Sequence, residues 1–191
     1  LALQAGTSRA TDSPDDRRDR RHSAWFMHAE LGRQSHDPRI GRVSVLFDYA
    51  SGDRDPSDGS TQRFDPLFGA RRFDFGPTGI YGPQGRSNML SPGVRWNAHP
   101  LAPTRLDITW RAFWLAQASD SHEGSGGVSG AAGERYVGQQ IEARIRQRVT
   151  DAVRLEAGAA WLRKGELLSS AAFNRSDRDA TYLYIQTTVH F

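Results

Sequence analysis

The residues most suited to chemistry are arginines that recur at alternate positions. Arg144, Arg146 and Arg148 are separated by uncharged residues. Guanidinium groups form paired hydrogen bonds with carboxylates and phosphates, and alternate residues of an extended strand project from one face. We therefore expect a face that binds oxyanions. Across the predicted strands this face carries eight arginines and five acids: Arg42, Arg95, Arg105, Arg111, Arg144, Arg146, Arg148 and Arg154, with Glu30, Asp48, Asp107, Glu142 and Glu156.

The acids on this face support a second interpretation, in which they only neutralise the arginines. Glu142 precedes Arg144 by two residues and Glu156 follows Arg154 by two, so each acid shares a strand face with an arginine. The spacing alone leaves ligand binding and structural pairing open.

Catalysis has weaker support in the sequence. Asp107 with Glu156, or His190 with Asp48, could form a pair of titratable groups, but no motif of recognisable spacing surrounds them. We expect no catalytic residues, no enzyme activity and no cofactor.

Composition narrows the class of protein. The 191 residues include no cysteine, only one lysine (Lys164) and a net charge of +3. No apolar run approaches the roughly 18 residues of a membrane-spanning helix, whereas barrel strands need lipid-facing residues only at alternate positions. Helical spans are therefore excluded and barrel strands are not. Because the sequence begins at Leu1 without a leader, we expect a fragment of a longer protein.

A period of two in hydrophobicity runs through most of the chain and ends in an aromatic residue, Phe191. It predicts an all-β, antiparallel fold with about seven strands at 22–34, 39–51, 88–100, 104–119, 135–150, 152–165 and 179–191. Residues 1–21 are predicted to be a strand end followed by a solvated, charged loop, because dense mixed charge cannot form a core.

The second face of the predicted strands is uncharged away from the strand ends, and it includes several tryptophans. Such a face suits contact with lipid, with the tryptophans at the bilayer interfaces. A soluble β-sandwich, as an acidic-glycan-binding module without catalysis, is the alternative. The predicted apolar positions include Trp25, Leu31, Val43, Val45, Val94, Trp96, Ala98, Trp110, Trp114, Val137, Ile141, Ile145, Leu155, Trp161, Leu183 and Ile185.

One segment also fits a helix. Ile141, Ile145, Val149 and Val153 are spaced by four, which is typical of one face of a helix. The alternation with period two accounts for every residue from 137 to 149, so we favour two strands joined by a turn at Asp151.

The predicted connections are of two kinds. Those at 35–38, 101–103 and 150–151 are short, and those at 51–87, 120–134 and 166–178 are long, as expected for the two ends of an outer-membrane barrel. The 51–87 loop carries enough apolar residues to fold back onto the protein, and we expect it to line or gate a channel through Phe64, Leu67, Phe68 and Phe73.

The aspartates of the same loop admit two interpretations. Asp53, Asp55 and Asp58 precede Gly59 and offer oxygen ligands suited to calcium, but the spacing is not that of an EF-hand. Asp-Pro and Asp-Gly pairs are also turn signals, so a series of Asx turns without a metal is the interpretation we favour.

Two runs resemble a known family: residues 47–53 (FDYASGD), which end a predicted strand, and residues 64–68 (FDPLF), followed by a glycine-rich segment. They resemble the alginate export porins of Gram-negative outer membranes. The resemblance covers residues 22–191 and is most specific over 44–99.

The resemblance implies the C-terminal part of a transmembrane barrel of about eighteen strands. It also implies passive export of an anionic polyuronate through an arginine-lined lumen, and from the eight arginines against five acids we expect that lumen to be anion-selective. The expected partners are outer-membrane lipid, the polysaccharide and, through the C-terminal strand, the barrel-assembly machinery; no nucleic acid is expected.

Overall fold

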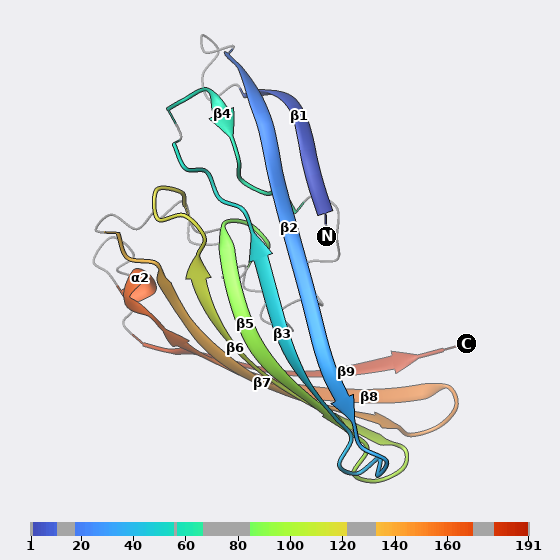
Figure 1. Cartoon of the computed structure of the whole chain (residues 1–191). Helices are drawn as coiled ribbons and strands as arrows, with labels where there is room; N and C mark the ends of the chain where they lie inside the picture. Colours follow the sequence, from blue (N-terminus) through green and yellow to red (C-terminus); the bar gives the residue numbers. More distant parts are fainter. Residues whose placement is uncertain are drawn as a thin grey trace.

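A computed structural model describes residues 2–10, 18–55, 57–66, 85–121, 133–169 and 178–190. These residues form one antiparallel sheet in which each long strand pairs with the next long strand along the chain (Figure 1). The strands are β1 (Ala2–Ala10), β2 (Arg18–Gln34), β3 (Arg42–Ala50), β4 (Ser60–Thr61), β5 (Met89–Ala98), β6 (Thr104–Leu115), β7 (Tyr136–Arg148), β8 (Val153–Lys164) and β9 (Ala180–Val189), with one short helix, α2 (Glu166–Ser169).

The seven predicted strands correspond to β2, β3 and β5 to β9, with every end within four residues of its predicted position. The segment that also fitted a helix forms β7 and β8, which pair from Gly138–Lys164 to Arg148–Arg154. The short connections lie together at one end of the sheet, and the long ones leave its other end (Figure 1). We call these the turn end and the loop end.

The charged segment near the N-terminus is more structured than expected. β1 extends to Ala10 and β2 begins at Arg18, so strands occupy much of the predicted loop at 1–21. A ladder can continue through charged residues because backbone pairing needs no apolar side chain where water surrounds the strands. The two-residue β4 also pairs, in parallel, with β2 at Arg21 and His22.

The structure also adds one helical turn within a predicted long loop. Leu167 and Leu168 of α2 are buried beside Val137 and Phe113 at the loop end. In the part of the chain that the structure describes, no helix is long and apolar enough to span a membrane.

The apolar side chains lie on an exposed face of the sheet. Leu31 is 82% exposed and Ile185 is 84% exposed, although both lie within paired strands, Ile185 in the middle of β9. We call the face that carries these residues the apolar face and its opposite the polar face. Because the described residues form a single curved layer rather than two packed sheets, they do not support the β-sandwich alternative (Figure 1).

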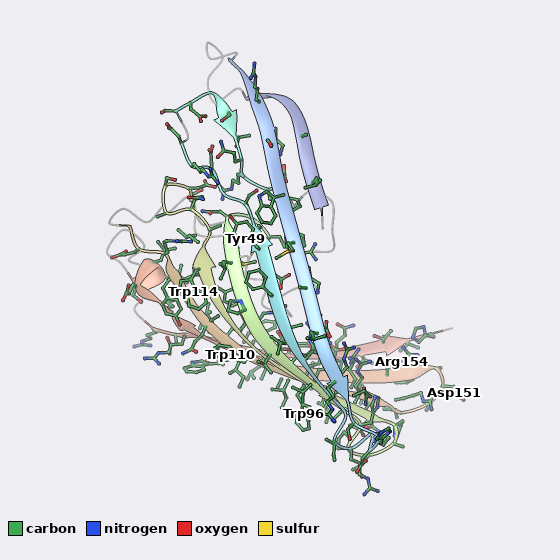
Figure 2. All side chains as sticks on the ribbon, in the orientation of Figure 1. Tyr49, Trp96, Trp110, Trp114, Asp151 and Arg154 are labelled. Atoms are coloured by element: carbon green, nitrogen blue, oxygen red, sulfur yellow. The ribbon has the colours of Figure 1, made fainter. Side chains whose placement is uncertain are left out.

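Aromatic residues lie near both ends of the apolar face. Trp25 stacks on Tyr49 with ring centroids 4.4 Å apart, and Trp114 contacts Tyr136 at 5.3 Å. Both pairs lie toward the loop end, whereas Trp96 lies toward the turn end (Figure 2).

The distance between these aromatic levels follows from the register. Trp114 pairs with Leu90, and Trp96 is the sixth residue after Leu90 in the same strand. Six residues of antiparallel strand span about 20 Å along the strand. Trp110 pairs with Val94, between these two levels.

Three residues predicted on the apolar face are buried instead: Val137, Ala98 and Ala112. Val137 is the unpaired residue of a β-bulge, since Phe113 pairs with Gly138 and Trp114 with Tyr136. The bulge interrupts the alternation, and Val137 joins a core cluster at the loop end.

The second exception, Ala98, is buried under the turn that joins β2 to β3. Gly41 in this turn has φ of 75°, and a Cβ there would lie 2.7 Å from the Ala98 Cα. Only glycine permits both this backbone conformation and this close approach.

Candidate functional site

The candidate site is the polar face, where the sequence analysis placed eight arginines. The β6–β7 register sets Asp107 opposite Arg144. Asp107 forms ion pairs with Arg144 (3.4 Å), Arg105 (3.3 Å) and Arg146, and it also accepts a hydrogen bond from the Asn97 amide. One buried carboxylate therefore holds three guanidinium groups, which leaves an excess of positive charge.

A second carboxylate, Asp48, anchors an arginine that is almost completely buried. Asp48 Oδ2 lies 2.6 Å from Arg111 Nη1, and Asp48 Oδ1 lies 2.7 Å from His28 Nδ1. Arg111 crosses over Gly93, its partner in the adjacent strand, where a Cβ would lie 2.7 Å from the Arg111 Cγ. The absence of a side chain at Gly93 thus gives the arginine room to lie flat on the sheet.

Glu30 holds a third group of arginines. Its two carboxylate oxygens lie 3.2 Å from Arg42 Nη2 and 3.4 Å from Arg95 Nη1. Three acids on this face therefore bind six of the eight predicted arginines.

The pairs expected within single strands are replaced by other contacts. Arg144 pairs across strands with Asp107, while Glu142 accepts a 3.4 Å hydrogen bond from Gln140 Nε2. Glu156 accepts a 2.6 Å hydrogen bond from the hydroxyl of Tyr184 rather than pairing with Arg154.

Arg148 and Arg154 complete the predicted set. They lie opposite each other in the β7–β8 register near the turn end. Neither side chain has an ion pair or hydrogen bond with another residue in the described ranges, and both are exposed. Figure 2 shows Arg154 near the turn at Asp151.

The segment after β3 folds back against the polar face, as far as it is described. Phe64 is buried with Ala24, Phe26 and Ala50, and its ring centroid lies 5.5 Å from that of Phe26. Phe26 and Ala50 occupy polar-face positions, so Phe64 covers part of that face. The other predicted gate residues, Leu67, Phe68 and Phe73, lie outside the described residues.

A hydrogen-bond network fixes this segment to the connection that follows β6. Arg63 donates to the hydroxyl of Ser87 (2.8 Å), to Asp120 Oδ1 (3.1 Å) and to both the hydroxyl (2.6 Å) and the carbonyl (2.8 Å) of Ser121. Asn88 adds a bond to the Gln117 carbonyl (2.9 Å). These hydrogen bonds join the described parts of the two connections into a cap at the loop end of the sheet.

The aspartates of the same segment serve as turn acceptors. Asp55 accepts hydrogen bonds from the amide and hydroxyl of Ser57, and Asp58 accepts the corresponding pair from Ser60. Within the described residues, no group of three potential metal ligands is close enough to hold an ion. The geometry is that of the Asx turns favoured from the sequence.

Asp53 occupies a different environment. Its amide donates to Asp120 Oδ2 (2.9 Å), and both carboxylates are buried beside each other. Burial, together with the negative charges of Asp120 and Asp58, raises the pKa of Asp53 above its usual value. Ionised Asp53 therefore places an unfavourable charge inside the cap.

Several important residues were absent from the sequence-based set: Arg63, Asn97, Gly158 and Tyr184. Tyr184 lies over Gly158, where a Cβ would lie 2.2 Å from the Tyr184 ring. The alternation places Tyr184 on the polar face. An aromatic ring that covers a glycine of the neighbouring strand is a recurrent contact in β-sheets, and this pattern could have identified the pair.

The comparison with known proteins agrees with this geometry. A sheet with an exposed apolar face and an arginine-rich polar face is typical of strands that separate lipid from water. The sequence model of the alginate export family matches residues 1–182, so the chain belongs to the alginate export family. The comparison with curated proteins gave no match.

Proposed function

We propose that this chain forms part of an outer-membrane channel of a Gram-negative bacterium, through which an anionic, uronate-containing polysaccharide leaves passively. The observation that supports this most is the contrast between the two faces of the same strands. Ile145 is 46% exposed on the apolar face, whereas its neighbours Arg144 and Arg146 bind the buried Asp107 on the other. In a soluble protein, exposing the apolar side chains and burying the charged ones would each cost free energy. A barrel wall requires both, because its apolar face contacts lipid and its charged face lines the lumen.

The open sheet fits a segment of a larger barrel wall. Within the described residues, β1 and β9 are edge strands and do not pair with each other. Closure by further strands would satisfy both edges, and the family resemblance leads us to propose about eighteen strands in all.

The arrangement of charge suits conduction of a polyanion. A polyuronate presents a carboxylate on each sugar, and it moves only if every binding site is weak enough to release it. On the polar face Asp107 partly neutralises three arginines, which reduces their affinity without removing their positive excess. Asp107 holds Arg144 and Arg146 in place, and both side chains remain partly exposed on the polar face.

The cap at the loop end suits a constriction. Phe64 covers the polar face near Phe26, and Arg63 holds the capping segment in place. We propose that this segment narrows the passage and that the exported chain passes beside it.

Current block in planar lipid bilayers tests the function. Uronate oligomers should reduce the current through the whole protein in a concentration-dependent manner, while neutral oligosaccharides of equal length should have a much weaker effect. Equal block by both, or block by neither, would contradict transport of an anionic glycan. A reversal potential in a KCl gradient provides the independent measure of anion preference.

A further inference from the structure

The strongest additional feature is a cavity of about 830 Å³ at the turn end of the polar face. Two turns and the ends of β6 to β9 form its walls, with residues 37–39 on one side and 188–190 on the other. Its volume falls in the range of about 300–1,000 Å³ that is typical of small-molecule sites.

The walls of this cavity are rich in positive charge. Five arginines line it, against two acids, Asp37 and Glu156; the arginines are Arg39, Arg105, Arg146, Arg148 and Arg154. Both acids have other contacts, because Asp37 Oδ1 accepts from the amide of Arg39 (2.9 Å) and Glu156 accepts from Tyr184. Neither acid forms an ion pair with one of these five arginines within the described residues.

Two of the arginines are arranged as if to share an anion. Arg148 and Arg154 are direct cross-strand partners, and like charges in that position repel each other. Arg146, on the same wall, pairs with Asp107, so Arg148 and Arg154 are the arginines of this wall without an ion pair in the described part of the chain. A carboxylate between the exposed Arg148 and Arg154 would relieve the repulsion and accept hydrogen bonds from both guanidinium groups.

We infer that this cavity is the docking site at which carboxylates of the glycan first bind, on the turn side of the channel. The inference rests on the proposed function. Short turns face the periplasm in outer-membrane barrels, so this is the side from which an exported chain arrives. Arg111, further along the strands, is buried against Asp48 and takes no part in this capture.

The test is current block measured from each side of the bilayer. These 191 residues contain no cysteine, so in a whole-protein background whose other cysteines, if any, are replaced, Ala152→Cys in a short turn allows the orientation of each inserted channel to be read by labelling from one chamber. Uronate oligomers are added to the turn side or the loop side of the whole protein. The variant Arg148→Gln/Arg154→Gln should require about tenfold more oligomer for half-block from the turn side, which corresponds to about 1.4 kcal/mol.

A matched control removes the same charge elsewhere. Arg33 and Arg163 are exposed at strand ends in positions of the apolar-face parity, so Arg33→Gln/Arg163→Gln should leave the block within about twofold of the wild type. From the loop side, both variants should also be blocked like the wild type. The charge-preserving Arg148→Lys/Arg154→Lys should fall between the two, because lysine loses the paired hydrogen bonds.

The outcomes separate the two proposals. Strong block of the wild type together with equal block of the Arg148→Gln/Arg154→Gln variant overturns the docking site and leaves the channel function standing. If the Arg148→Gln/Arg154→Gln variant is blocked less strongly than the wild type to the same extent from both sides, the docking site is also overturned, since such a result indicates a general effect of the lost charge. Absence of block in the wild type overturns both, and block by inorganic phosphate at the same concentration overturns the preference for the glycan.

Discussion

Two adjacent residues of β9 allow the assignment of the faces to be tested. Ile185 is 84% exposed on the apolar face, and Gln186 is exposed on the polar face. Ile185 lies four residues before Val189, about 14 Å along the strand, and therefore near the middle of the expected lipid band. Ile185→Arg would place a guanidinium in hydrocarbon, whereas Gln186→Arg would place the same group opposite Glu156.

The expected costs differ by a wide margin. An arginine near the bilayer midplane of a barrel costs about 2–4 kcal/mol, so Ile185→Arg should reduce the folding equilibrium constant by roughly 30- to 700-fold. Gln186→Arg should change the free energy of unfolding by less than about 0.5 kcal/mol. Urea unfolding of the whole protein in lipid vesicles measures both. Similar costs at the two positions would refute the assignment of the faces.

Three further predictions concern the polar face and its cap. Asp48→Leu should destabilise the protein by about 3–5 kcal/mol in urea unfolding, because it leaves Arg111 buried without its carboxylate, and adding Arg111→Met should recover much of the loss. Gly158→Val should cost about 1–3 kcal/mol by displacing the ring of Tyr184, and the added change Tyr184→Ala should relieve the clash; an unchanged unfolding midpoint in the single variant would contradict the observed packing. The raised pKa of Asp53 means that the folded protein binds its proton more tightly than the unfolded chain does, so stability should fall as the pH rises from the usual aspartate pKa through the raised value. Thermal unfolding of Asp53→Asn should show a smaller loss over that interval, and an identical pH profile would count against the buried charge.

The strands and their faces were predictable because each strand repeats a simple physical requirement. Alternation assigned Leu31, Val45 and Ile185 to the apolar face, and all three are exposed there. It failed at Val137, where a bulge shifts the register by one residue, and at Ala98, where a turn covers the strand. Neither feature changes the local composition enough to be recognised in a single sequence.

The partners of the arginines were not predictable in the same way. Glu142 and Arg144 share a face, but residues two apart in one strand lie about 7 Å apart at their Cα atoms. Long side chains can bridge that distance, as Arg105 does to Asp107 within β6, but cross-strand neighbours lie about 5 Å apart, and only the register shows that Asp107 lies opposite Arg144. The cap was missed for a related reason, since Arg63 and Asp120 are distant in sequence and meet only through the fold.

The central claim is that the polar face lines a passage for an anionic glycan. Its most direct measurement is the release of fluorescently labelled uronate polymer from sealed lipid vesicles that contain the whole protein. Release should be faster than from protein-free vesicles, should exceed that of a neutral glucan of equal length, and should stop when the outer-membrane protein is heat-unfolded before reconstitution. Retention of the uronate polymer while the neutral glucan escapes would contradict the account.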